Sequence, residues 1–182
     1  MTFETFNTRG KGILQAALAT ARQIVSGDTE IKFLTLAGNV DQGKTHLAIS
    51  VVRAWLAKRK PARFCDCDLM LNELRQGFNL EGEESYARQF DRLCKTPLLV
   101  LDDVGMRPPT SWGLDQLQML IQYRTLHSLS LVVTTNNPLA SIVGNKDDEH
   151  ALASSRIASR LQRESYCRVI ILDGQESRTW RL

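Results

Sequence analysis

Apolar residues return every three or four positions in several stretches of the chain, a spacing that predicts amphipathic helices. The first stretch covers residues 11–25, and the turn at Ser26–Asp28 ends it. Pro61 blocks extension of the second helix, and Asp68 can cap the third. The helices after the first are expected over about 44–60, 68–77, 84–94, 113–127 and 151–163.

Short apolar runs between these helices predict strands, over residues 31–37, 62–67, 97–102, 129–133 and 167–172. The run at 97–102 is apolar without interruption, as expected of a strand that is buried on both faces. Residues 138–150 are polar and are expected to form a loop. Strands that alternate with helices predict an α/β fold, with helices on both faces of a parallel sheet. Ligands of such sheets bind beyond the carboxyl ends of the strands.

A glycine-containing loop lies between the first predicted strand and the second predicted helix. It matches the phosphate-loop pattern G-x-x-x-x-G-K-[ST] in full, in residues Gly38, Asn39, Val40, Asp41, Gln42, Gly43, Lys44 and Thr45. Backbone N–H groups of such a loop face the phosphates of a nucleotide, and the following helix N-terminus adds positive charge. We expect Lys44 to reach the β- and γ-phosphates of ATP and the Thr45 hydroxyl to bind Mg²⁺.

Asp41 stands where many loops of this kind carry glycine. Aspartate tolerates a positive φ better than most residues do, but its carboxylate lies near the negative charges of the nucleotide. Two like charges about 5 Å apart repel by about 3 kcal/mol at an effective dielectric near 20, which is about two decades in affinity. The repulsion shrinks if the side chain turns to solvent. ATP binding is therefore expected, at an affinity that Asp41 reduces.

Two acidic residues end the strand predicted over 97–102. Asp102 would lie at the carboxyl edge of the sheet, where it can hold Mg²⁺. Asp103 follows it and can polarise the water that attacks the terminal phosphate. An acidic turn at a strand end has the same sequence, but the phosphate loop upstream favours the catalytic interpretation.

Polar groups near the end of the chain leave two interpretations open. The Asn136 amide can orient water against the γ-phosphate as a nucleotide sensor, or it can open a loop through Asn-Pro turn chemistry. Arg156 and Arg160 lie four residues apart and share one helix face. An arginine offered to the γ-phosphate of a neighbouring molecule accelerates hydrolysis by about 10³–10⁵-fold. A solvated basic face has the same sequence.

Charge changes this picture only slightly. The 182 residues include 23 Lys and Arg and 20 Asp and Glu, so the net charge of +3 permits an anionic partner without requiring one. The densest basic cluster is Lys58–Lys60 with Arg63, which we interpret as favourable charge at a helix C-terminus in preference to a nucleic-acid contact. Arg75, Arg88 and Arg92 lie in or near the third and fourth predicted helices and are candidate DNA contacts.

Three features of the sequence bear on cellular location: its apolar runs, its first residues and its cysteines. It has no run of about 18 apolar residues, so no membrane partner is expected, and its first residues do not form a signal peptide. The four cysteines are expected to be reduced core thiols, at positions Cys65, Cys67, Cys94 and Cys167. We therefore expect a cytoplasmic protein.

The order of these motifs resembles that of the AAA+ ATPases of the DnaC/DnaI helicase-loader and IstB transposition-helper group. The likeness is carried by Thr2–Phe6, Gly43–Ala48, Leu99–Gly105, Val132–Asn136 and Arg156–Leu161. The resemblance implies a three-layer P-loop NTPase of the AAA+ (ASCE) class with a parallel sheet of order 5-1-4-3-2.

The resemblance also implies residue roles. It puts Phe3 and Phe6 near the adenine and extends the nucleotide-binding segment to His46. It makes Asn136 the first sensor and Arg160 the arginine finger, with Arg156 beside it. The two helices predicted between the second and third strands match an insertion of the replication-initiator clade, which lines a helical oligomer and touches single-stranded DNA.

Members of this group load a replicative helicase or direct a transposase. The implied partners are therefore ATP with Mg²⁺, single-stranded DNA, one of those two proteins, and further copies of this chain. We expect a single AAA+ domain over residues 1–182, with no separate helicase-binding domain before Thr2. The helical lid is expected to be absent or truncated, because about ten residues follow the last predicted strand. Arg178 and Arg181 could substitute for a lid arginine, but we interpret them as tail charges.

Two other functions remain open at this point. Asp41 could disable the phosphate loop and leave a DNA-binding or scaffold module that does not hydrolyse ATP. A nucleoside or metabolite kinase is a third possibility, but the Asp-Asp and Thr-Thr-Asn strand ends suit an ATPase better than a small-acceptor transferase.

Overall fold

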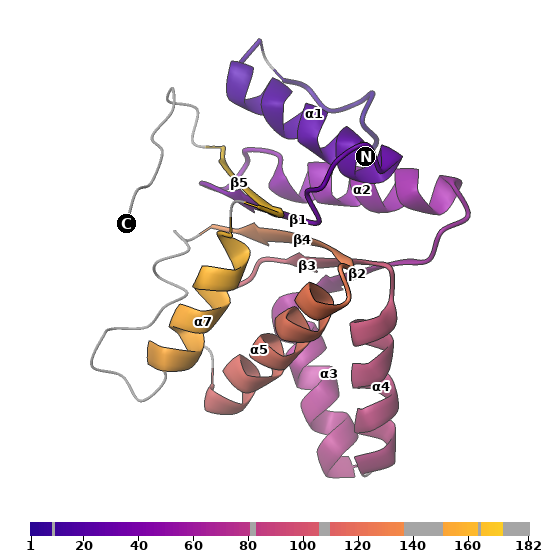
Figure 1. Cartoon of the computed structure of the whole chain (residues 1–182), viewed down its shortest axis with the longest axis vertical. Helices are drawn as coiled ribbons and strands as arrows, with labels where there is room; N and C mark the ends of the chain where they lie inside the picture. The colour runs from indigo at the N-terminus through magenta and orange to yellow at the C-terminus, as the bar shows by residue number, and fades with distance from the viewer. Residues whose placement is uncertain (9, 81–82, 106–109, 137–150, 164, 173–182) are drawn as a thin grey trace.

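The computed structural model describes residues 1–8, 10–80, 83–105, 110–136, 151–163 and 165–172, and within them the chain forms a five-stranded sheet (Figure 1). The strands are β1 (Phe33–Ala37), β2 (Ala62–Asp66), β3 (Leu98–Asp102), β4 (Ser130–Thr135) and β5 (Cys167–Ile171). The loop predicted over 138–150 and the arginines at 178 and 181 lie outside the described residues.

Each pair of neighbouring strands is parallel, and their order is β2-β3-β4-β1-β5. This is the predicted order 5-1-4-3-2, read from the other edge of the sheet, so the fold prediction is confirmed. Because the strands are parallel, the segments that follow β1, β4 and β3 leave the same edge of the sheet beside one another. The phosphate loop, the Thr-Thr-Asn segment and the Asp-Asp pair follow these three strands.

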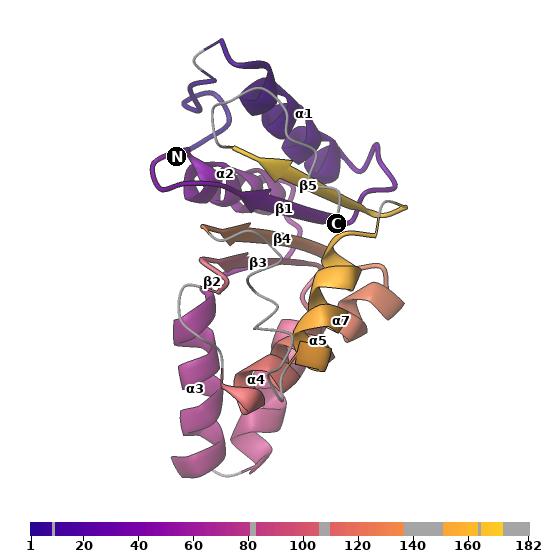
Figure 2. The same cartoon turned by 90° about the vertical axis from the view of Figure 1, so that its left-hand side faces the viewer.

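Helices cover both faces of the sheet (Figures 1 and 2). One face carries α1 (Gly12–Ser26) and α2 (Lys44–Ala57). The helices on the other face are α3 (Cys67–Leu80), α4 (Glu83–Lys95), α5 (Ser111–Leu126) and α7 (Ala151–Leu161). Helices α3 and α4 lie side by side and project away from the sheet, as Figure 2 shows most clearly. They are the pair predicted between the second and third strands.

The strands contribute alternate side chains to two hydrophobic cores. In β3, Leu98 and Val100 pack into the core under α1 and α2, whereas Leu99 and Leu101 pack into the core on the other face. All four side chains are fully buried. This alternation explains why residues 98–101 include no polar position, since both faces of the strand are covered.

Several observed boundaries differ from the predicted ones, and local hydrogen bonds account for two of them. Helix α2 ends at Ala57 rather than near residue 60, because Arg59 adopts a left-handed φ of 57° and its N–H donates to the Leu56 carbonyl at 2.8 Å. Helix α3 begins at Cys67, and Asp66 caps it by accepting the Leu69 N–H at 2.9 Å, so the prediction that Asp68 is the cap was wrong. Strand β4 runs to Thr135 instead of ending at residue 133.

Two further sequence expectations concern the described residues. None of the described helices is both long enough and apolar enough to cross a membrane. All four cysteines are free thiols; Cys67, Cys94 and Cys167 are buried, and Cys65 is half-buried.

Arg124 joins three elements inside the second core. Its side chain is fully buried on α5. Its Nη1 atom donates to the carbonyls of Leu93 at 2.9 Å and Cys94 at 3.2 Å. Its Nη2 atom donates to the carbonyls of Pro97 at 3.2 Å and of Ser130. Burial lowers the pKa of this guanidinium to about 10, so the group is still charged at neutral pH. Arg124 therefore fixes the end of α4 and the starts of β3 and β4 relative to α5.

We predict that Arg124→Met lowers the free energy of unfolding by about 3 kcal/mol or more, because it removes a charged donor from several buried carbonyls. Arg53→Met removes an exposed guanidinium from α2 and should change the same free energy by less than about 0.5 kcal/mol. Chemical denaturation measures both variants. Similar small effects at the two positions would contradict the role assigned to Arg124.

Candidate nucleotide site

The phosphate loop connects β1 to α2 in a backbone conformation that few sequences can adopt. Three of its residues have positive φ, with 139° at Gly38, 62° at Asp41 and 85° at Gly43. Gly38 also lies against β5, since a Cβ atom there would meet backbone atoms of Leu172 at 3.1 Å. The two motif glycines therefore occupy positions where a side chain would be strained, and Asp41 adopts a conformation that aspartate tolerates at some cost.

Lys44 begins α2 and turns its side chain back into the loop. The side chain is 5% exposed, and its ammonium group donates to the carbonyls of Gly38 at 2.8 Å and Asn39 at 2.7 Å. Burial lowers the pKa of Lys44. Three carboxylates oppose this shift, those of Asp103, Asp102 and Asp41. A buried cation at a helix N-terminus, beside loop amides, has the chemistry of a phosphate-binding group.

Thr45 and Asp102 meet at the sheet edge although 57 residues separate them. The Thr45 hydroxyl donates to Asp102 Oδ1 at 3.2 Å, and the Asp102 side chain is 7% exposed. Mg²⁺ prefers oxygen ligands of this kind and usually takes its remaining ligands from substrate phosphates and water. The two side chains fit the predicted metal site, because they bring one hydroxyl and one carboxylate together beside Lys44.

Asp103 follows directly, with a left-handed φ of 57°. Its backbone N–H donates to the Thr134 hydroxyl at 2.9 Å. Burial raises the pKa of the Asp103 carboxyl, and the neighbouring Asp102 carboxylate raises it further, while Lys44 opposes the shift. A carboxylate with a raised pKa beside a buried cation is suited to accept a proton from water.

The N-terminal segment packs against the start of α2. The Phe6 ring blocks the space beside Gly43, where a Cβ atom would lie 2.9 Å from it, and contacts the His46 ring edge-on at a centroid distance of 5.5 Å. His46 Nε2 lies 3.1 Å from the Thr2 carbonyl oxygen and 3.2 Å from Thr5 Oγ1. His46 thus ties this segment to α2.

A cavity of about 140 Å³ lies beside the loop, and among its lining residues are Phe6, Asp41, Gly43 and His46. Phe3 is not among the lining residues. It is buried in the core of α1 and α2, with the Arg22 guanidinium 5.7 Å from its ring centre. Of the two aromatic residues expected near adenine, Phe6 alone therefore borders this cavity.

The remaining predicted site residues lie outside the loop itself, with Asn136 at the sheet edge beside it and the two arginines on α7. Asn136 is half-buried directly after β4. Arg156 is exposed on α7 and Arg160 is partly exposed, with its guanidinium 3.5 Å from the Arg156 carbonyl oxygen. Helix α7 covers the face of the sheet opposite α2 (Figure 1). Both arginines therefore lie on a helix that covers the sheet face opposite α2.

Thr134 is the polar contact that the sequence interpretation missed. Its fully buried hydroxyl donates to Asp102 Oδ1 and accepts the Asp103 N–H. The available signal was a hydroxyl residue ending a buried strand beside the acidic strand. Nothing in the linear spacing shows which side chain that hydroxyl meets.

The family model described as IstB-like ATP binding protein matches residues 6–179. The chain belongs to the IstB-like ATP-binding protein family. A Mycobacterium tuberculosis protein named for ATP binding and for an insertion sequence is 32% identical over 139 residues. That match covers 74% of this chain and 53% of the relative, so the chain spans about half the length of that protein.

Solved structures show the same fold for this IstB-like protein. A crystal structure of the DnaC helicase loader matches with a TM-score of 0.71 and 22% identity, covering 93% of this chain and 95% of that one. The replication initiator DnaA bound to AMPPCP and single-stranded DNA matches with a TM-score of 0.75 and 16% identity, covering 93% of this chain and 49% of that one. The IstB-like protein thus has the AAA+ P-loop NTPase fold.

The raised pKa of Asp103 predicts a pH-dependent gain in stability from Asp103→Asn. The folded state disfavours the ionised carboxylate, so stability falls as the pH rises from the ordinary aspartate pKa to the folded value, and it stays lower above that value. Asparagine removes the charge and tolerates the left-handed backbone. The variant should therefore melt at a higher temperature than the native protein near neutral pH.

The gain should disappear at about pH 3, where the carboxyl is largely protonated in both states. Thermal melts at the two pH values measure it, with the exposed Asp115→Asn on α5 as the control. A variant that melts no higher at neutral pH, or equally higher at both pH values, would contradict a destabilising charge at Asp103.

Proposed function

We propose that this AAA+ protein is a Mg²⁺-dependent ATPase that assembles head to tail and acts on DNA together with a DNA-acting protein. The observation that carries the proposal is the contact between Thr45 and Asp102, 3.2 Å apart and beside the buried Lys44. Without the phosphate loop, Asp102 would be an ordinary acidic residue at a strand end. Next to the phosphate loop, the side chains of Lys44, Thr45 and Asp102 form the group that binding of a triphosphate and its metal requires.

In this proposal the backbone amides of residues 39–45 bind the phosphates, and the Lys44 ammonium exchanges its loop carbonyls for β- and γ-phosphate oxygens. Thr45 and Asp102 hold Mg²⁺, which supplies positive charge against the charge on the phosphates. Asp103 accepts the proton of the attacking water, and the Asn136 amide orients that water. Phe6 and His46 border the space beside the loop that we assign to the nucleoside.

Arg160 is the proposed arginine finger, with Arg156 beside it. Both lie on α7, on the sheet face opposite α2 (Figure 1). Because α7 covers the sheet face opposite the helix that follows the phosphate loop, we infer that Arg160 acts on the nucleotide of a neighbouring copy. This arrangement supports a head-to-tail oligomer, in which each site is completed by the next chain.

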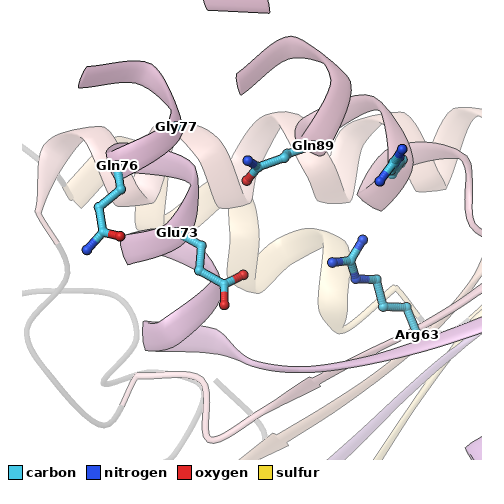
Figure 3. Close-up of a pocket in the computed structure, with 6 residues that line it drawn as sticks. Arg63, Glu73, Gln76, Gly77 and Gln89 are labelled. Atoms are coloured by element: carbon cyan, nitrogen blue, oxygen red, sulfur yellow. The ribbon is translucent and has the colours of Figure 1, made fainter. Parts of the chain in front are cut away.

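DNA contacts are proposed for the projecting pair α3 and α4. A cavity of about 350 Å³ lies between these helices and β2, lined by Arg63, Glu73, Gln76, Gly77, Gln89 and Arg92. Figure 3 shows Arg63, Glu73 and Gln89 converging on it from β2, α3 and α4. Guanidinium groups suit phosphate oxygens, and carboxamides suit base edges. Arg75 and Arg88 are exposed on the same two helices.

The similarity to DnaA bound to AMPPCP and single-stranded DNA supports a nucleic acid on this fold. The similarity to the DnaC helicase loader, together with the insertion-sequence relative, supports either a replicative helicase or a transposase as the protein partner. Family membership favours the transposase, because the curated relative is the more similar in sequence.

The proposal predicts that Lys44→Ala abolishes ATP binding, because it removes the buried cation at the loop. Lys95→Ala removes an exposed lysine from the end of α4 and should bind ATP as the native protein does. Calorimetric titration with ATP and Mg²⁺ measures both variants. Native-like affinity in Lys44→Ala would exclude this loop as the nucleotide site.

A second candidate function is a DNA-binding scaffold that does not hydrolyse ATP. Two observations at Asp41 favour it. The backbone there has a left-handed φ of 62°. The Asp41 carboxylate also acts electrostatically on Lys44, so a phosphate group would have to compete with it for the lysine. The side chain is exposed to solvent, however, which weakens its repulsion of a nucleotide. We therefore prefer the ATPase.

Asp41→Gly distinguishes the two functions. The ATPase proposal predicts phosphate release by the native protein and a gain in ATP affinity of less than about tenfold in the variant, because exposed charges interact by about 1 kcal/mol. Phosphate release and ATP titration of both proteins give the comparison. Release by the glycine variant alone would favour the scaffold.

A further inference from the structure

Thr134 lies where β4 ends, next to the acidic end of β3. Its side chain is fully buried, and its hydroxyl donates to Asp102 Oδ1. The same hydroxyl accepts the backbone N–H of Asp103 at 2.9 Å. One side chain on the neighbouring strand thus contacts both members of the acidic pair.

The direction of these two hydrogen bonds follows from the chemistry of the groups. A backbone N–H can only donate, so the Thr134 oxygen accepts from Asp103. The single hydroxyl hydrogen is then left for Asp102, whose ionised carboxylate accepts it. Each bond supports the other, because a hydroxyl that donates to a carboxylate becomes a better acceptor.

The contact with Thr134 also supports an unusual backbone conformation at Asp103. A φ of 57° is uncommon for residues other than glycine and requires support from the surrounding structure. Thr134 gives that support twice, since its carbonyl also accepts the Val104 N–H at 2.9 Å. The turn that aims the Asp103 side chain is therefore attached to the end of β4.

We propose that Thr134 is a positioning residue that orients Asp102 toward the metal and Asp103 toward the attacking water. This inference rests on the function proposed above. Thr45 and Thr134 both donate to Asp102 Oδ1. When Thr45 turns its hydroxyl to a metal, Thr134 remains as the hydroxyl that holds the carboxylate in place.

Thr35 provides a matched control. It lies on β1, is fully buried like Thr134, and its hydroxyl has no hydrogen-bond partner among the described residues. Thr35→Val and Thr134→Val make the same chemical change in neighbouring parallel strands. Thr134→Ser keeps the hydroxyl and loses only a methyl group.

Hydrogen exchange of backbone amides in the nucleotide-free protein tests the positioning directly. Thr134→Val should speed exchange at the Asp103 amide by about tenfold or more, the factor that corresponds to about 1.4 kcal/mol. The Val104 amide should change little, because its acceptor is the backbone carbonyl of residue 134. Thr134→Ser and Thr35→Val should leave the Asp103 amide protected as in the native protein.

A second readout is the Mg²⁺ dependence of ATP affinity, measured by titration with Mg²⁺ and with a chelator. Thr134→Val should lose about 10–100-fold of the enhancement that Mg²⁺ gives, the usual cost of removing a partner of a metal ligand. Its affinity without Mg²⁺ should match that of the native protein. Thr134→Ser should restore the Mg²⁺ response.

The outcomes separate this inference from the proposed function. If the native protein binds no ATP, the proposed function fails, and this inference fails with it. If the native protein binds ATP with a Mg²⁺ response that Thr134→Val retains, only the positioning role is overturned. Should Thr134→Val not fold, Thr134→Ser decides, because loss of the Mg²⁺ response or of Asp103 protection in that folded variant contradicts a role for the hydroxyl.

Discussion

The hydrogen bonds that Asp102 accepts are the constraint on which the candidate site depends. They join the start of α2, the end of β3 and the end of β4 at one carboxylate, through Thr45 and Thr134. These segments are far apart in the sequence and meet only because β1, β4 and β3 are parallel neighbours. The same arrangement brings the buried Lys44 under the electrostatic influence of Asp102 and Asp103. The site is therefore a property of the sheet edge as a whole.

The rest of the structure keeps that edge in register. Strands such as β3 are covered on both faces, so each must stay aligned with two helical layers at once. Arg124 adds a buried link between the end of α4, the start of β3 and the start of β4 at the opposite edge. The acidic pair at one end of β3 and Arg124 at the other thus both hold β3 against β4.

The sequence predicted most of the fold, because its signals were local. Apolar spacing identified the helices and strands, and their alternation indicated the parallel sheet. The phosphate-loop motif and the acidic strand end then identified the loop, lysine and acidic residues at its edge. The errors arose where a side chain or a turn decides a boundary. Asp66 rather than Asp68 caps α3. The left-handed backbone conformation of Arg59 ends α2 before the chain reaches Pro61. The contacts of Thr134 and Arg124 depend on which residues the sheet makes neighbours, and linear spacing carries no such information.

The most direct test of nucleotide binding at this loop is the backbone amide NMR spectrum of the labelled protein during titration with ATP and Mg²⁺. We expect saturable shifts of the amides of residues 40–45, with smaller shifts for AMP, which lacks the β- and γ-phosphates. Amides of this loop that stay unchanged in millimolar ATP and Mg²⁺ would contradict a phosphate-binding role for it.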